Sequence, residues 1–218
     1  PTTTQKLMER GLVAELFINM ITIDHREEHK KLLRSKKVNF NYDTEMKLIG
    51  TIKERRDLII KILKNVKGNS MLLFNFKETF GEPLYEEIKE AFPNHKVFYV
   101  DGDTKDRTLA QETADKEDNV IIVASYGVFS TGISIKNIHN LFLVTPYKSL
   151  TRVLQSIGRG LRLGRNKTKC NLFDFVDDLS SRRINTTLRH GQERYKIYLN
   201  QNFKNIKNIS YKIGDKDE

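Results

Sequence analysis

The spacing of apolar side chains changes near residue 68 of this chain. Upstream, the run LFINMITI at 16–23 is rich in Ile and Phe, which predicts a β-strand. Between 43 and 64 apolar residues recur at helical spacing, which predicts one long helix. A short helix ending near Gly11 and a helix-plus-loop segment at 24–40 complete the predicted lead-in, residues 1–67.

Downstream, short apolar runs alternate with amphipathic segments. Continuous apolar runs are typical of strands that are buried on both faces, as in a parallel sheet. The alternation predicts an α/β domain over 68–180 with an open, doubly wound, mainly parallel sheet. After it, residues 181–218 are expected to form a helical extension, with a helix near 182–203, and a frayed tail. The predicted strands are 70–76, 96–102, 119–125, 140–146 and 169–177, and the predicted helices are 83–92, 106–115 and 149–162.

The predicted helix at 149–162 has two unlike sides. Its core side carries Leu150, Val153, Leu154, Ile157 and Leu161. The opposite side carries Gln155, Arg159 and Arg162, flanked by Gly158 and Gly160. Two guanidinium groups one turn apart are able to bind a phosphate through charge-assisted pairs. An exposed basic helix face is the plainer interpretation; the two glycines and the glutamine favour a functional one.

Charge and composition narrow the class of protein. The net charge of +10 and the pI of about 9.5 favour a polyanionic partner such as nucleic acid, although a merely solvated basic surface fits the same numbers. One cysteine and five scattered histidines give no zinc-ligand spacing, so no metal site is predicted, and Cys170 is expected to be buried. We find no signal peptide and no run that crosses a bilayer, which predicts a cytoplasmic location.

Four other polar stretches are each given a structural interpretation. In DFVDD (174–178), Asp177 or Asp178 is expected to cap a following helix. DGD (101–103) predicts a turn, and HREEHKK (25–31) a solvated charged face. RHGQERYKIY (189–198) mixes basic and aromatic residues, and docking contacts are favoured there over a nucleic-acid clamp.

The stretch QSIGRGLR at 155–162 resembles motif VI, Q-x-x-G-R-x-x-R, of superfamily 2 helicases and translocases. ASYGVFSTGISI (124–135) resembles their motif V, and MLLFNFKETFGEPLYEEI (71–88) their motif IV. Order and spacing match the second RecA-like lobe of these motors over roughly half the chain. Within this superfamily, the motif sequences most resemble those of UvsW-type phage recombination helicases. The lead-in PTTTQKLMERGLVAELFI also resembles the segment that connects the two lobes of such helicases.

The resemblance implies nucleotide-binding roles for five residues. Arg162 takes the arginine-finger position, Arg159 also reaches the phosphates, and Gln155 organises the contact between the lobes. Gly132 matches the motif V glycine near the nucleotide. Ser134 stands where many relatives have the Asp that binds the ribose, so that a hydroxyl replaces a carboxylate.

The resemblance also implies a track for nucleic acid. Asn75, Phe76 and Lys77 follow the motif IV strand, where relatives contact the tracking strand. Ser125 ends the motif V strand and matches a position associated with the nucleic-acid backbone. Backbone amides and small polar side chains suit phosphate contacts that ignore base identity.

A motor of this class also needs a phosphate loop and an acidic motif that holds Mg²⁺. The chain contains neither G-x-x-x-x-G-K-[ST] nor a D-E-x-H or D-E-A-D run. The resemblance therefore implies that ATP and Mg²⁺ bind only in a longer parent protein, where an N-terminal RecA-like lobe completes the site. The chain by itself is expected to be inactive.

Three functions follow as hypotheses. The first is the C-terminal motor lobe of an ATP-dependent DNA helicase or translocase that acts on branched recombination or replication intermediates. Its partners would be branched or single-stranded DNA and the N-terminal lobe, in the host cytoplasm if a phage encodes it. The second is a non-catalytic nucleic-acid-binding module with a RecA-like fold, and the third is a nucleotide-binding regulator.

Overall fold

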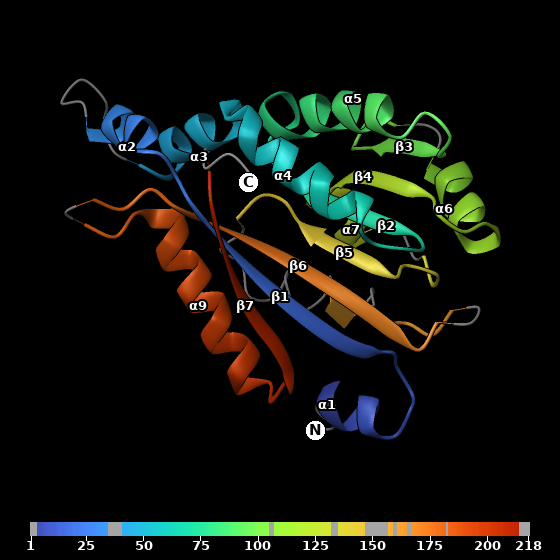
Figure 1. The fold of residues 1–218 in the computed structure, drawn as a ribbon. Coiled ribbons are helices and arrows are strands. Elements are labelled where there is room, and N and C mark those ends of the chain that lie inside the picture. The colour runs from blue at the N-terminus through green and yellow to red at the C-terminus, as the bar shows by residue number, and fades with distance from the viewer. Residues whose placement is uncertain are drawn as a thin grey trace.

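Seven parallel strands form one sheet, in the order β3-β4-β2-β5-β6-β1-β7, and this confirms the predicted open, doubly wound α/β fold (Figure 1). The strands are β1 (Glu15–Asp24), β2 (Ser70–Phe74), β3 (Val97–Val100), β4 (Ile121–Ser125), β5 (Asn140–Leu143), β6 (Lys169–Asp178) and β7 (Asn205–Lys212). The computed structural model describes residues 4–34, 41–104, 107–131, 135–146, 157–158, 161–164, 167–181 and 183–213.

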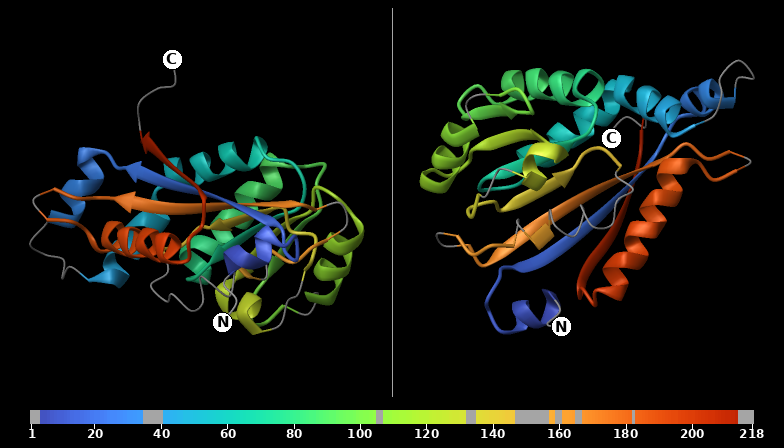
Figure 2. Two further views of the ribbon diagram at one scale, coloured as in Figure 1. Left: turned by 90° about the horizontal axis from the view of Figure 1, so that it is seen from below. Right: turned by 180° about the vertical axis from the view of Figure 1, so that it is seen from behind.

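Helices cover both faces of this sheet (Figure 2). One face packs against α2 (Glu27–Arg34), α3 (Tyr42–Thr51), α4 (Lys53–Lys64), the π-helix η1 (Lys77–Gly81) and α5 (Glu82–Ala91). The other face packs against α1 (Thr4–Glu9), α6 (Arg107–Lys116), α7 (Tyr126–Thr131) and α9 (Thr186–Asn200). No described helix has both the length and the hydropathy to span a bilayer.

Burial on both faces explains why the strands read as continuous apolar runs. In β2, Met71 and Leu73 enter one core layer, while Leu72 and Phe74 enter the other. Successive side chains of a strand point to opposite faces, so a strand with a helical layer on each side has no solvent-facing position.

Strand β1 belongs to the lead-in by sequence but lies inside the sheet. It pairs with β6 along its whole length, from Glu15 beside Lys169 to Asp24 beside Asp178. Its other edge pairs with β7. The lead-in and the C-terminal extension therefore meet in the same sheet as the strands of 68–180 (Figure 1).

Strand β7 corrects the prediction of a frayed tail after the C-terminal helix. Helix α9 confirms the predicted helix, but residues 205–212 then return to the sheet as its outermost strand beside β1. Most side chains of β7 are exposed, since β7 is the outermost strand and has a neighbouring strand, β1, on one edge. An edge strand of this kind lacks the apolar run by which the inner strands are predicted.

The single helix predicted over 43–64 is two helices. Helix α3 ends at Thr51, and Ile52 has an extended backbone with ψ of 106° before α4 begins. The Thr51 hydroxyl donates to the Leu48 carbonyl, and Arg56 Nη1 donates to the Gly50 carbonyl that the break exposes (2.6 Å). The side chain of Ile52 is itself buried, so the apolar spacing continues across a change of direction.

A buried charge cluster joins the lead-in to the end of β6. Arg55 donates from Nε to Asp177 Oδ1 (2.7 Å) and from Nη2 to Oδ2 (3.0 Å). His25 Nε2 lies 2.9 Å from the same Oδ1. All three side chains are buried, so the helix cap predicted for Asp177 is wrong, and so is the solvated face where it includes His25.

A second buried pair joins β6 to α9. Arg194 makes a forked ion pair with Asp174 (Nη2 to Oδ1 2.7 Å), and the Tyr198 hydroxyl donates to Asp174 Oδ2 (2.8 Å). Gly191 lies so close to Val176 that an added Cβ would be 2.4 Å from its methyl carbon. These contacts agree with the docking interpretation of 189–198.

The start of α9 is capped from another helix. The Glu45 carboxylate accepts hydrogen bonds from the backbone N–H groups of Thr186 (2.9 Å) and Thr187 (2.7 Å) and from Asn185 Nδ2 (2.6 Å). A carboxylate at a helix N-terminus satisfies its unpaired N–H groups and opposes the helix dipole. The cap expected from the DFVDD stretch is thus supplied by α3, which locks the C-terminal extension to the lead-in.

Candidate functional site

The carboxyl ends of the parallel strands bring the predicted strand contacts together. Phe74, the last residue of β2, lies beside Ser125, the last residue of β4. Asn75 directly follows Phe74, and its backbone N–H donates to the Thr145 hydroxyl beyond β5 (3.1 Å). The three neighbouring strands β4, β2 and β5 thus place the ends of the motif IV and motif V strands at one edge of the sheet.

Phe76 has an unusual backbone. Its φ of 69° and ψ of 90° lie on the left-handed side, which costs a bulky residue about 1–3 kcal/mol. The π-helix η1 begins immediately after it, and both Phe80 N–H (3.0 Å) and Gly81 N–H (3.3 Å) donate to the Phe76 carbonyl. Phe76 is 36% exposed, and its ring lies 6.4 Å from each of the rings of Tyr42 and Phe80 in tilted contacts.

Lys77, the third predicted strand contact of motif IV, is already paired with acidic side chains. Its Nζ lies 2.8 Å from Asp101 Oδ2 and 3.7 Å from Asp103 Oδ2. Burial raises the pKa of Asp101, but hydrogen bonds from Lys77, Thr104 and the Asp103 N–H outweigh it and lower that pKa to about 2. The predicted DGD turn is confirmed here, since Asp103 N–H donates to Asp101 Oδ1 (3.0 Å).

Ser125 starts a short helix rather than a loop. Its Oγ accepts a hydrogen bond from the Val128 N–H (3.4 Å) at the beginning of α7. Val128 and Phe129 are buried under the sheet. Ser125 itself is half-buried, so part of the residue faces solvent at the strand end.

Of the predicted nucleotide contacts, only Arg162 lies within the described residues. Gly132, Ser134, Gln155 and Arg159 lie outside them. Ile157 and Leu161 are buried in the core, as predicted for the apolar side of this segment, whereas Arg162 is exposed. No described atom lies within 4 Å of a Cβ built on Gly158, so none of the described chain crowds this glycine.

The chain leaves β5 through an exit segment, residues 144–146, which sequence analysis does not single out. Each of its carbonyl oxygens accepts a hydrogen bond from a side chain. Arg55 Nη2 donates to the first (2.7 Å), the Tyr126 hydroxyl to the second (3.2 Å) and the Tyr42 hydroxyl to the third (2.6 Å). The next described residue after the exit segment is Ile157, so these contacts hold the chain just before the predicted nucleotide-binding residues.

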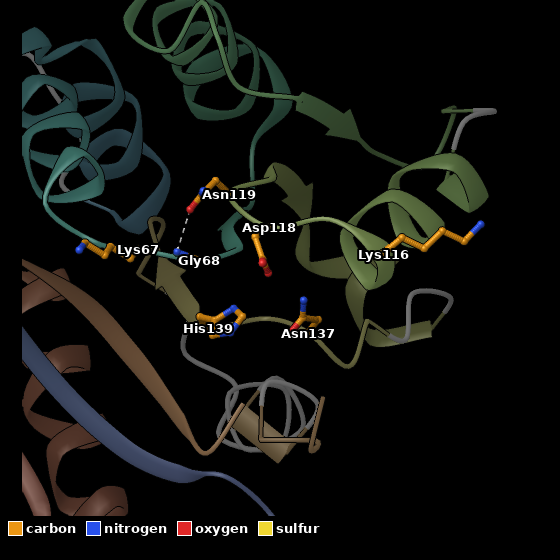
Figure 3. A pocket seen from close by; sticks show the side chains of 7 residues that line it. All are labelled: Lys67, Gly68, Lys116, Asp118, Asn119, Asn137 and His139. Atoms are coloured by element: carbon orange, nitrogen blue, oxygen red, sulfur yellow. Dashed lines mark hydrogen bonds between the residues drawn. The ribbon is translucent and has the colours of Figure 1, made fainter. Parts of the chain in front are cut away.

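A hollow of about 460 Å³ lies at the opposite edge of the sheet, where the strands begin (Figure 3). The side chains of Asp118, Asn137 and His139 point toward its centre, whereas Lys116 points away. The Gly68 N–H donates to Asn119 Oδ1 (3.1 Å) at its rim. None of the predicted site residues that the structure describes lines this hollow.

The described part of the chain was compared with the requirements of a metal site and of a reactive thiol. There, no three His, Cys, Asp or Glu side chains are grouped so that they could hold a metal ion. Cys170 is buried as predicted, and burial raises the pKa of its thiol to about 11, so the nucleophilic thiolate is not formed near neutral pH.

Comparisons with known proteins identify relatives of the chain. Residues 54–164 match the helicase conserved C-terminal domain. The chain is 36% identical over 219 residues to the ATP-dependent DNA helicase uvsW of Enterobacteria phage T4, a match over 93% of this chain and 42% of that protein. It is 31% identical over 131 residues to the putative ATP-dependent helicase IRC3 of Saccharomyces cerevisiae, over 57% of this chain and 18% of the relative.

Solved structures agree with these matches. The crystal structure of T4 UvsW superposes with a TM-score of 0.75 and 32% identity, over 92% of this chain and 42% of that one. A fragment of a putative HsdR subunit of a type I restriction enzyme from Vibrio vulnificus YJ016 superposes with a TM-score of 0.67, over 95% of this chain and 38% of that one. Its 15% identity shows the common fold alone.

The match covers 42% of the length of the phage relative. The family match runs from α4 to residue 164 and includes the site at the carboxyl edge of the sheet. The RecA-like fold, the order of the motifs and these matches agree, and the chain belongs to the helicase conserved C-terminal domain family, in a form similar to UvsW.

Proposed function

We propose that this chain is the C-terminal motor lobe of an ATP-dependent DNA helicase or translocase that acts on branched recombination or replication intermediates. The observation that carries the proposal is the 36% identity to a DNA helicase over 93% of the chain. The register of β2 and β4 supports it, because it places Asn75 and Ser125 side by side at the edge where a strand of DNA would run. The lobe would work in the cytoplasm, with DNA and an N-terminal RecA-like lobe as partners.

In this proposal, Arg159 and Arg162 bind the phosphates of ATP and offset the charge that develops during phosphoryl transfer. Gln155 organises the contact between the lobes, and Gly132 and Ser134 border the nucleotide. The exposure of Arg162 fits this role, since its guanidinium group has to reach beyond its own lobe. Mg²⁺ would neutralise phosphate charge, and the other lobe would hold it, because the described residues offer no acidic ligand cluster.

Contact with DNA falls to Asn75, Phe76, Lys77 and Ser125. The amide and hydroxyl groups of Asn75 and Ser125 suit phosphate oxygens, which present no sequence information. Lys77, whose side chain is exposed, would exchange its buried partner Asp101 for a phosphate when DNA binds. Closure of the two lobes around ATP would then move this half of the track along the strand.

A second candidate function is a non-catalytic nucleic-acid-binding module. It is favoured by the net charge of +10, which suits a polyanionic partner. A nucleotide-binding regulator is the third. Binding to branched DNA that weakens as salt increases would be expected for either of the first two functions, and no binding at low salt would favour the third.

Assays of ATP hydrolysis and fork unwinding, with the full-length parent protein and with residues 1–218 alone, separate the first two functions. We expect the parent to hydrolyse ATP and to unwind forked DNA, and the chain alone to do neither, because arginine fingers need a phosphate cradle and Mg²⁺ ligands. Forked-DNA binding by a parent that does not hydrolyse ATP would support the binding module instead. Micromolar ATP binding by residues 1–218, measured by calorimetry, would contradict the division of labour between two lobes.

Replacing Phe76 by alanine is expected to weaken single-stranded DNA binding by about 1–3 kcal/mol, because an exposed ring can stack on a base. Fluorescence anisotropy with a labelled oligonucleotide would measure the loss. Tyr211→Ala is a matched control, since Tyr211 is also 36% exposed but lies in β7, far along the sheet. Equal affinities of the Phe76→Ala and unaltered proteins would show that this ring does not touch DNA.

A further inference from the structure

In the sequence, Thr145 lies between the four proposed DNA contacts and the arginines. Its hydroxyl accepts a hydrogen bond from the Asn75 N–H (3.1 Å), and its carbonyl accepts one from the Tyr126 hydroxyl (3.2 Å). Tyr126 is the residue directly after Ser125. One fully buried residue of the exit segment is therefore bonded to the chain next to both strand contacts.

These two hydrogen bonds connect the exit segment to the end of β2 and to the start of α7 through short, buried contacts. Residue 145 is ten positions before Gln155 and seventeen before Arg162 in the sequence. The Tyr126 side chain is buried, and Asn75 is half-buried, so water has little access to replace either bond. A buried donor that loses its acceptor is destabilised by more than the net contribution of the bond, so the groups on both sides are constrained to move together.

The other two carbonyls of the exit segment are held by the lead-in. Arg55 binds the first and Tyr42 the third, and Arg55 is itself fixed by the buried Asp177. These partners belong to α3 and α4, which lie on one face of the sheet. The lead-in therefore fixes the position of the exit segment, whereas the hydrogen bonds of Thr145 connect it to the DNA edge.

We propose that Thr145 is a positioning residue that couples DNA contact at Asn75 and Ser125 to the position of the exit segment, and through it to ATP hydrolysis. The proposal rests on the proposed motor function. A shift of Asn75 or of the start of α7 on DNA binding is transmitted through the two hydrogen bonds of Thr145 to the exit segment, which precedes Arg162 in the sequence. Thr145 contacts neither nucleotide nor DNA in this scheme.

The test is Thr145→Val in the full-length parent protein, which removes the hydroxyl acceptor and keeps the size and the β-branch of the side chain. We expect the ratio of kcat with saturating single-stranded DNA to kcat without DNA to fall about tenfold, in line with the loss of one buried hydrogen bond. The KM for ATP is expected to stay within about twofold. Thr145→Ser keeps the hydroxyl and is expected to restore the ratio.

Tyr126→Phe removes the donor to the Thr145 carbonyl and is expected to lower the same ratio. If Thr145→Val does not fold, the ratio measured with Tyr126→Phe tests the coupling role. Thr51→Val is the matched control, since the Thr51 hydroxyl donates to the Leu48 carbonyl within α3 and lies outside the site.

An unchanged ratio in both Thr145→Val and Tyr126→Phe would overturn the coupling role. Equal losses with and without DNA would also overturn it, because they would indicate a purely structural role. An unaltered parent whose ATP hydrolysis does not respond to DNA would instead refute the proposed motor function, so the two failures are distinguishable.

Discussion

Arg162→Ala in the full-length parent protein is expected to lower the kcat for ATP by about 10³-fold or more. An arginine finger stabilises the charge on the transferring phosphoryl group and typically contributes at least that factor. Arg162 is exposed and follows the buried Leu161. Steady-state hydrolysis measurements with saturating ATP and DNA would determine the change.

DNA binding provides the internal control for this variant. The proposed DNA contacts are Asn75, Phe76, Lys77 and Ser125, so the affinity of Arg162→Ala for single-stranded DNA is expected to stay within about twofold of that of the unaltered protein. Arg10→Ala removes another exposed arginine, outside the site, and is expected to leave hydrolysis unchanged. Near-normal turnover by Arg162→Ala would reject the finger assignment.

Asp177→Ala is expected to destabilise the fold by about 3–5 kcal/mol, because it leaves Arg55 as a buried charge without its carboxylate partner. Both side chains are almost completely inaccessible, so water cannot replace the lost ion pair. Urea unfolding followed by circular dichroism would measure the free energy of unfolding. Asp57→Ala removes an exposed carboxylate paired with Lys53 and is expected to change this free energy by less than about 1 kcal/mol.

The same carboxylate gives the stability a pH dependence. Burial raises the pKa of Asp177, but Arg55 and His25 outweigh it and lower the pKa from 3.8 to about 2. A depressed carboxyl pKa in the folded state means that its contribution is complete above pH 4 and is lost as the pH falls toward 2. We expect this part of the acid sensitivity to be absent from Asp177→Ala. A loss below 1 kcal/mol at neutral pH would contradict the role given to the ion pair.

The inner strands are predictable from sequence because burial on two sides leaves a continuous apolar run. Residues 70–74 and 121–125 are such runs, and both are strands of the central sheet. Strand β7 escapes prediction because its sequence, NIKNISYK, is mostly polar and lies at the sheet edge. The break at Ile52 is not predicted because the apolar spacing of α3 continues into α4 while the direction of the chain changes.

Charged residues in the core are predicted less well than apolar ones. Asp174 and Asp177 read as solvent-facing or capping residues, since a sequence does not show that Arg194 and Arg55 are their partners. The exit segment presents the same difficulty, because its bonds join residues up to 104 positions apart. Motifs identify where a site lies, but the contacts that hold it come from distant parts of the chain.

The place of β1 between β6 and β7 determines the order in which this protein can be completed during synthesis. The ribosome makes residues 15–24 before the two strands with which they pair. Those strands, at 169–178 and 205–212, emerge only after about 150 and 190 further residues, on the order of ten seconds or more later. Until then an apolar strand with two unpaired edges is exposed to other nascent chains. We expect protection of this segment by chaperones to determine the yield of the soluble protein.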